Sequence, residues 1–468
     1  MTENFNHPES DQDIITSRTD LELQNIDELR QAIAHADRDQ ILALLEGEHH
    51  ADIADKFEQL AAEERADTVD LAPEVLSPAV LAELEDEVLE DILPLLPAER
   101  ISDAVQELDS DDAVQLVEEL DDTRRAEVLA VLPDRDREDL EAGFAFDEET
   151  AGRLMQREFV AAPQFWTVGQ TIDHMRAQSD KDSDALPDLF FDVYVINTHF
   201  HPIGVLALSA LMKCGRDVPL KNVMKELPVL IEPNTDQEDV AYLFGKYDLI
   251  SAPVIDADGR LTGMITVDDM VEVINEENTE DLLALAGVSD AGLTDTSFSI
   301  VKARAPWLLV NLLTAIGASI VISLFKDEIT KLVALAVLMP IVASLGGNTG
   351  TQALAVAIRG LATRDLTAAN AWRVVRREAL AALMNGVIFA VLLAGITYVW
   401  FKNPELSLVI AAALIFNLFC AGLAGILVPL GLKKVGADPA VASSVFVTTV
   451  TDIVGFFAFL GLASWMLL

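Results

Sequence analysis

The last third of the chain alternates between long apolar runs and short charged loops. Each of five runs is long enough to cross a hydrocarbon core, which needs roughly 20 helical residues, and Asp452 is the only charged residue in any of them. Buried helices of soluble proteins are seldom so long or so numerous in succession. We therefore predict five membrane-spanning helices in a membrane domain over residues 304–468. The runs are 305–325, 332–358, 379–401, 406–432 and 439–468.

The pattern at the N-terminus is different. Residues 21–145 show short apolar stripes of helical period, and many begin with Pro or follow Asp or Ser. Such residues are typical of helix N-termini, so we predict an acidic α-superhelical N-domain built from short helices. Residues 1–20 are polar and acidic, without the basic region and apolar core of a signal peptide, and they are predicted to form a disordered tail.

Residues 146–278 carry strand patterns between amphipathic helices. An α-β-β-α order occurs twice, with Gly204 and Gly263 at equivalent positions, and the first copy has an extra polar insert, SDKDSDALPD. The repeat resembles a tandem cystathionine-β-synthase (CBS) pair, an α/β module, and this resemblance implies a ligand sensor rather than a catalyst. CBS pairs bind nucleotides in some families and only transmit strain in others, so a nucleotide cofactor stays open here.

The net charge is distributed unevenly. The first 300 residues contain 70 acidic and 20 basic residues, whereas the remainder contains 7 acidic and 12 basic residues. An acidic surface of this kind repels phosphates and attracts cations, so nucleic acid is not expected as a partner. Adaptation to high salt is an alternative explanation of the total charge, but it does not explain where individual acids cluster.

The loop charges predict an orientation. Nine Lys and Arg residues lie on one side of the predicted membrane helices and three lie on the other. Since basic loops stay in the cytoplasm, the N-terminal domains are predicted to be cytoplasmic and the C-terminus to lie outside a cell (inner) membrane. The two cysteines, Cys214 and Cys420, lie in unlike settings and indicate neither a disulfide nor a zinc site.

An acidic segment leads into the first apolar run, and a connecting helix is predicted over residues 279–303. Between residues 261 and 301 there is no Lys or Arg. Acids four residues apart on a helix repel one another, which destabilises the helix unless cations neutralise them. A divalent-cation bridge and a plain solvated face both account for the run. Its acids are Asp268, Asp269, Glu272, Glu276, Glu277, Glu280, Asp281, Asp290 and Asp295.

Two features within the apolar runs indicate a polar path. An ionised Asp452 facing lipid would cost about 3 kcal/mol, so it is expected to face water, or else to be protonated or hydrogen-bonded between helices. In the second run, Pro340 is followed by GGNTGTQ at residues 346–352. Three glycines and four polar side chains predict an unwound segment that lines a cavity. Close helix packing through small residues is the alternative.

The order of these parts resembles the MgtE family of magnesium channels or transporters. The resemblance rests on GGNTGTQ in the second membrane helix and TTVTDIVGF in the fifth. It implies a homodimer whose second and fifth membrane helices line a central pore. Asp452 matches the family's pore aspartate, and Asp438 matches an acidic position at the cytoplasmic pore mouth. Thr448 stands where a backbone oxygen of the pore site lies, and Gly347 and Asn348 fall in the second-helix pore motif.

The same resemblance implies cytoplasmic metal sites that sense Mg²⁺. Eight positions fall at or near the family's sensor acids, with Glu272 in place of an Asp, and three acids in the sequence ELDSDDA are candidates in the N-domain. The first set is Asp236, Glu238, Asp248, Asp269, Glu272, Glu277, Glu280 and Asp281, and the second is Asp109, Asp111 and Asp112.

We therefore expect a multi-domain membrane protein that imports Mg²⁺. Because Mg²⁺ gives up its waters reluctantly, Asp452 carboxylates from two chains, with carbonyls of the unwound segment 346–350, would hold the hydrated ion. Cytosolic Mg²⁺ would bridge the N-domain, the CBS pair and the connecting helix and close the pore. The alternatives are a secondary carrier for another divalent cation, such as Co²⁺ or Mn²⁺, and a membrane-anchored CBS receptor without transport. No nucleophile, base and orienting group can be picked out together, so an enzyme is not expected.

Overall fold

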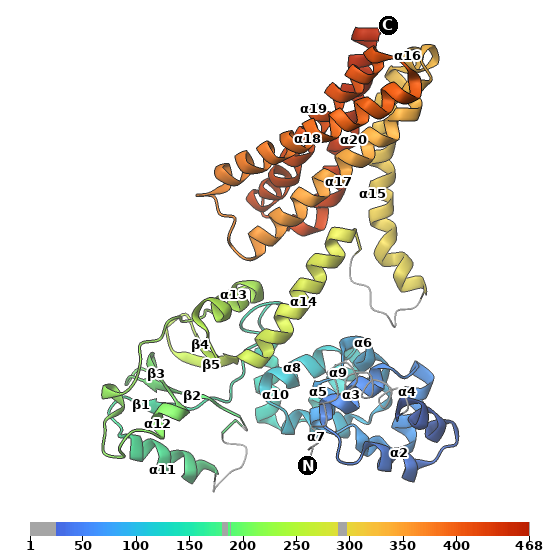
Figure 1. The fold of residues 1–468 in the computed structure, drawn as a ribbon. Helices are drawn as coiled ribbons and strands as arrows, with labels where there is room; N and C mark the ends of the chain where they lie inside the picture. Colours follow the sequence, from blue (N-terminus) through green and yellow to red (C-terminus); the bar gives the residue numbers. More distant parts are fainter. Residues whose placement is uncertain (1–24, 180–185, 188, 289–296, 468) are drawn as a thin grey trace, which may run out of the picture. The chain divides into compact units, whose positions relative to one another are not determined.

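The computed structural model describes residues 25–179, 186–187, 189–288 and 297–467 (Figure 1). It separates into two compact units, Met1–Ile274 and Asn275–Leu468. The tail predicted over residues 1–20, and the acids Asp290 and Asp295, lie outside the described residues.

Short helices form the N-terminal domain, as predicted, around one apolar core that extends from Ile26 to Leu140. Asp37, Ser77 and Asp121 cap helices by accepting hydrogen bonds from backbone amides, which explains why helices begin there. After a first helix at residues 25–34, the helices are α2 (Arg38–Leu45), α3 (His50–Glu58), α4 (Ala62–Leu71), α5 (Pro78–Ala82), α6 (Asp86–Ile92), α7 (Ala98–Glu107), α8 (Ser110–Glu118), α9 (Asp122–Val131) and α10 (Asp134–Gly143).

Two arginines join successive helices of this domain in the same way. The buried Arg65 donates from Nε to the carbonyl of Phe57 and from Nη2 to that of Glu58. Arg125 donates from the same atoms to the carbonyls of Val117 and Glu118. Each guanidinium therefore adds hydrogen bonds to carbonyls in the last turn of the preceding helix, which supports a repeating superhelical layer.

The predicted αββα repeat is confirmed by the next elements. In the first copy, β1 (Ala161–Pro163) pairs in parallel with β2 (Asp192–Ile196), and β2 pairs antiparallel with β3 (Pro202–Ala207). In the second copy, β4 (Ser251–Ile255) and β5 (Leu261–Thr266) form the same hairpin, and a parallel bridge between Ile231 and Val254 replaces the first strand. The helices are α11 (Val168–Ser179) and α12 (Leu208–Leu211), then α13 (Gln237–Tyr247) and α14 (Val267–Ala286).

Close packing explains why glycine occurs at the equivalent positions 204 and 263. A Cβ on Gly204 would lie 2.9 Å from the backbone oxygen of Lys225, and a Cβ on Gly263 would lie 2.8 Å from that of Gln156. In each copy, a neighbouring segment crosses the third strand at this point, so only glycine fits.

Among the described residues of the second unit, five helices are long and apolar enough to cross a membrane, which confirms that prediction. Helix α19 packs against α17, α18 and α20, while α15 packs mainly on α20. A short helix, α16, connects the first two. The helices are α15 (Ser297–Leu324), α16 (Lys326–Lys331), α17 (Ala334–Ala362), α18 (Ala371–Phe401), α19 (Pro404–Lys434) and α20 (Pro439–Leu467).

Candidate functional site

Six carboxylates lie near enough to repel one another where the N-terminal ends of α8 and α14 approach. We call them the acidic cluster: Asp109, Asp111 and Asp112 at the start of α8, and Asp268, Asp269 and Glu272 at the start of α14. All six belong to the first unit. The three N-domain candidates from the sequence are thus brought together with Asp269 and Glu272, whereas Asp268 had been noted only as part of the acidic run.

Hydrogen bonds from backbone amides hold the two helix ends in place. The amide of Ser110 donates to Glu158 Oε2 at 3.2 Å, and the amide of Arg157 donates to Ser110 Oγ at 2.8 Å. The adjacent Gln156 pairs with Met264 of β5 through backbone hydrogen bonds of 2.8 Å in both directions. Residues 156–158 therefore connect the start of α8 to the strand that precedes α14.

The carboxylates of the acidic cluster are buried close together, and this favours their protonated, neutral forms. Burial raises the pKa of Asp112 to about 7, with added repulsion from Asp269 and Asp109. Burial and the Asp269 carboxylate also raise the pKa of Asp111 well above its usual range. A divalent cation would relieve the same repulsion, because carboxylate oxygens are the donors that Mg²⁺ accepts. Across the described residues, no three His, Cys, Asp or Glu side chains converge closely enough to form a chelating site.

Asp112 gives a testable pH dependence. Its folded-state pKa of about 7 exceeds the unfolded value, so between about pH 4 and pH 7 the folded protein binds more protons than the unfolded protein. Without divalent cations, the free energy of unfolding should therefore fall as pH rises through that window. Asp112→Asn should raise Tm at pH 8 in EDTA by about 2–4 °C, or about 1 kcal/mol, and change it little at pH 4.5. Thermal unfolding of the full-length protein measures both, with the exposed Asp103→Asn as control; an equal change at the two pH values would contradict the assignment.

The other predicted cytoplasmic acids occupy helix ends. Asp236 caps α13 and accepts a hydrogen bond from the amide of Glu238 at 2.9 Å. Asp248 ends the same helix in a left-handed conformation, with φ of 52°. At 1.5 Å per residue the two ends of α13 lie about 18 Å apart, so the structure does not bring Asp248 together with Asp236.

The last turns of α14 contact the membrane helices. Ala284 is buried with Leu354 and Ile358 of α17 and Val447 of α20. Burial raises the pKa of Asp281, and the Asp438 carboxylate at the start of α20 adds to this. Glu277 and Glu280 lie on the same part of α14. Helix α14 is continuous across the predicted domain boundary at residue 278, and it ends at Ala286, on the second unit.

The predicted break in the second membrane helix is wrong. Helix α17 is continuous through GGNTGTQ, because its glycines allow close packing rather than unwinding. A Cβ on Gly346 would lie 2.3 Å from Nδ2 of Asn417 in α19, and one on Gly350 would lie 2.5 Å from Val447 Cγ1 in α20. The backbone carbonyls of residues 346–350 are thus part of a helix, so the alternative of close packing holds for these two glycines.

The polar residues of the motif lie elsewhere on α17. Asn348, Thr351 and Gln352 are exposed in the single chain, and their spacing puts them on one face of the helix. Apart from its chain neighbours and the backbone of its own helix, no described atom lies within 4 Å of the position that a Cβ on Gly347 would occupy. On α20, Thr448 is exposed and Asp452, one turn later, is half-buried. We call Asn348, Thr351, Gln352, Thr448 and Asp452 the polar face.

The threonines of α20 form hydrogen bonds along the helix. The hydroxyl of Thr448 donates to the carbonyl of Ser444, and the buried Thr451 donates to the carbonyl of Thr448, both at 2.9 Å. The Thr448 carbonyl, the atom implied by the family resemblance, therefore already accepts a hydrogen bond from a side chain.

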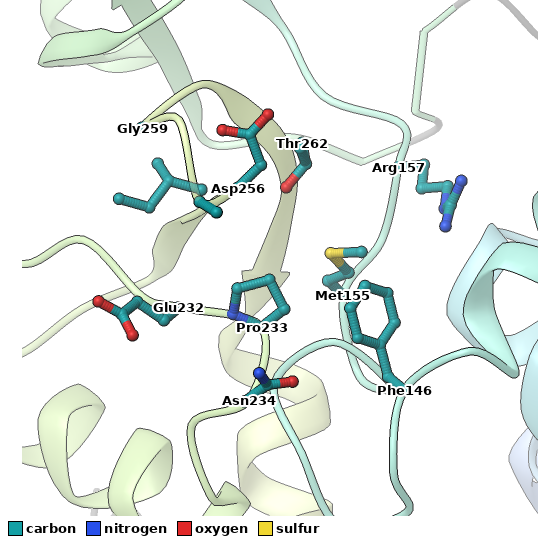
Figure 2. Close-up of a pocket in the computed structure, with 11 residues that line it drawn as sticks. Phe146, Met155, Arg157, Glu232, Pro233, Asn234, Asp256, Gly259 and Thr262 are labelled. Atoms are coloured by element: carbon teal, nitrogen blue, oxygen red, sulfur yellow. The ribbon is translucent and has the colours of Figure 1, made fainter.

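A separate cleft of about 800 Å³ lies in the first unit (Figure 2). Phe146, Met155 and Pro233 form apolar walls, and Asp256 and Arg157 contribute charge. Arg157 also forms an ion pair with Asp139, with 3.4 Å between Nη1 and Oδ1. The cleft had no signal in the sequence, because its walls come from segments far apart in the chain.

Models of known families match three parts of the chain. The model described as a divalent cation transporter, MgtE, matches residues 339–462, the MgtE intracellular N domain matches 48–149, and a CBS domain matches 220–276. The magnesium transporter MgtE of Thermus thermophilus is 32% identical over 445 residues, which is 94% of this chain and 98% of that protein. The magnesium transporter MgtE of Bacillus subtilis is 31% identical over 82% of this chain and 84% of its own length.

Solved structures are similar to the soluble part. The cytosolic domain of the Mg²⁺ channel MgtE in complex with ATP is 29% identical, with a TM-score of 0.47, and the match covers 53% of this chain and 99% of that one. The soluble part of a magnesium transporter is 26% identical, with a TM-score of 0.46, over 55% of this chain and 99% of its own.

Proposed function

The chain belongs to the MgtE family of magnesium transporters, and from that premise we propose that two copies enclose a path for hydrated Mg²⁺ along the polar face of α17 and α20. The named relatives are transporters of magnesium, which favours Mg²⁺ over the alternative of a carrier for another divalent cation. The match to the MgtE intracellular N domain supports a cytosolic location for the N-terminal domains.

The polar face is the observation that carries this proposal. Asn348, Gln352 and Thr448 are exposed on helices of membrane length, and Asp452 is half-buried. Polar side chains of this kind do not face lipid, because lipid offers them no hydrogen-bond partners. A second copy of the chain would cover the face, and water between the copies would satisfy its polar groups.

The chemistry of this path suits an ion that keeps its water. The carboxylates of two Asp452 residues would accept hydrogen bonds from water bound to Mg²⁺, and the hydroxyl and amide groups of Thr448 and Asn348 would add weaker contacts. The open space beside Gly347 leaves room for water molecules. Helical carbonyls of residues 346–350 have no part in this scheme, because α17 is not unwound.

Closure is proposed to depend on α14. Its last turns pack on the inner ends of α17 and α20, and Asp281 lies near Asp438. Mg²⁺ bound between such acids would hold α14 on the membrane helices, and Mg²⁺ in the acidic cluster would hold its first turns against α8. When cytosolic Mg²⁺ falls, carboxylate repulsion would favour the released, open state, since an ion shifts an equilibrium by its differential affinity for the two states.

Loop charges favour one orientation of the chain in the membrane. The excess of Lys and Arg in the loops on one side favours a C-terminus outside the cell. The cleft of Figure 2 is a poor candidate for a triphosphate, because Glu232 and Asp256 oppose Arg157 there. We therefore assign no nucleotide to that cleft.

The proposed pairing of two chains along the polar face can be tested by cross-linking in membranes. In a background in which Cys214 and Cys420 are replaced by Ser, Thr351→Cys on the polar face should form covalent dimers with a flexible bis-maleimide. Val391→Cys, which is 68% exposed on α18, should stay mostly monomeric, because we expect it to face lipid. Equal dimer yields from both variants, or none from Thr351→Cys, would contradict a shared polar path.

A further inference from the structure

Asn417 of α19 is a fully buried polar side chain in the middle of the membrane helices. Its exposed fraction is 0%, and its Nδ2 donates a hydrogen bond of 2.9 Å to the carbonyl of Val342 in α17. In the described part of the chain, its Oδ1 has no hydrogen-bond partner. Leaving a buried acceptor unpaired costs about 1–3 kcal/mol, so stability alone gives no reason for an Asn at this position.

The carboxamide of Asn417 lies between the backbones of two helices. Its Nδ2 is 2.3 Å from the position that a Cβ on Gly346 of α17 would occupy, and 2.7 Å from the corresponding position on Gly455 of α20. Contacts this short leave room only for hydrogen at both sites. One side chain from α19 thereby sets how closely α17 and α20 approach it.

Both glycines lie next to residues of the polar face. Gly346 precedes Asn348 by two residues, and Gly455 follows Asp452 by three, less than one helical turn. A shift of either helix at Asn417 is therefore transmitted to the side chains proposed to meet the ion. The hydrogen bond to Val342 adds a fixed register along α17, which a purely apolar contact would not provide.

We propose that Asn417 is a positioning residue that sets the spacing and register of α17 and α20, and through them the ability of the path to select hydrated Mg²⁺. The inference rests on the proposed function. Mg²⁺ requires near-octahedral geometry and retains its waters, whereas Ca²⁺ accepts irregular geometry and more ligands. A loosened path should therefore lose Mg²⁺ flux and lose discrimination against Ca²⁺.

The first test replaces Asn417 by Leu, which has a similar volume and no polar atoms. The purified variant should fold, and in liposomes its Mg²⁺ flux should fall about 10-fold, since small misplacements of a site are costly. Its Mg²⁺/Ca²⁺ flux ratio should fall as well, a change that a merely structural role would not produce. Asn385→Leu, an exposed Asn of α18, is the matched control and should keep both values.

The second test measures the contact between Asn417 and Gly346 without relying on transport. Gly346→Ala should lower Tm strongly in the wild-type background, where its methyl group meets Asn417, and lower it much less in an Asn417→Ala background. Equal Tm losses in the two backgrounds would overturn the inference. So would wild-type flux and ion ratio in a folded Asn417→Leu protein. Wild-type protein that moves no Mg²⁺ would instead refute the proposed function on which the inference rests.

Discussion

Protein carrying Asp452→Asn is expected to fold and to transport Mg²⁺ about 100-fold more slowly than the wild type. A hydrogen bond to a charged group contributes about 1.5–3 kcal/mol, and two such carboxylates face the ion in the proposed dimer, so at least about 3 kcal/mol is lost. Asn keeps the size of the side chain, so the packing of α20 should not change. Flux into liposomes, measured with a Mg²⁺-sensitive dye, gives the rate, and size-exclusion chromatography gives the state of the protein.

The control for this experiment should also remove a polar group from α20. Thr449→Val is suitable, because the Thr449 hydroxyl donates to the carbonyl of Val445 within its own helix. We expect the control to retain most of its flux. Full transport by a folded Asp452→Asn protein would refute the proposed role of the carboxylate. Absence of flux from the wild type would revive the alternative of a membrane-anchored receptor.

Neutralising the end of α14 should remove inhibition by cytosolic Mg²⁺. We expect the triple variant Glu277→Gln, Glu280→Gln, Asp281→Asn to keep its flux when Mg²⁺ on the cytoplasmic face is raised. The wild type should slow by about 10-fold or more, a normal size for coupling between two sites. The reason is that the variant lacks the carboxylates through which Mg²⁺, beside Asp438, would hold the last turns of α14 on the membrane helices. Limited proteolysis with and without Mg²⁺ gives an independent measure of closure.

This experiment also separates a sensor from a generally acidic surface. The triple variant Asp134→Asn, Glu138→Gln, Glu141→Gln removes the same number of charges from exposed positions of α10. If salt adaptation accounts for the acids, the two triple variants should behave alike. If the end of α14 is a sensor, only its own variant should lose the response. Wild-type inhibition and wild-type Mg²⁺-dependent protease protection in the α14 variant would refute the proposed closure.

Periodicity predicted the elements of the fold well. Apolar runs longer than a hydrocarbon core have few alternatives to membrane helices. The repeat around Gly204 and Gly263 was readable because a backbone crossing requires glycine in both copies. The segment 77–93 was harder: its helical period is unbroken in sequence, but in the structure it forms two helices, α5 and α6, with a turn around Leu84.

The site was predicted less completely, because its parts meet through tertiary contacts. The sequence showed the spacing of the acids on α14. It did not show that Asp112 of α8 lies near Asp269. Gly346 and Gly350 were expected to unwind α17, since their partners on α19 and α20 cannot be seen in one helix alone. Asn417 was not predicted, because its amide carries no charge to mark it as unusual in an apolar run. It is nevertheless the single Asn of the run 406–432, and this could have indicated a polar contact between membrane helices.

The close packing along α17 also determines the energetics of opening. Gly350 meets Val447 of α20, and a Cβ on Gly425 of α19 would lie 2.6 Å from both the Gly350 carbonyl and Ala353 Cβ. With so little space between them, we expect these three helices to move as one body, so the apolar surface that opening exposes is limited to the contact of α14 with α17 and α20. The heat-capacity change of opening should thus be small. Its dependence on ionic strength should be steep, because the groups that separate are charged and hydrated.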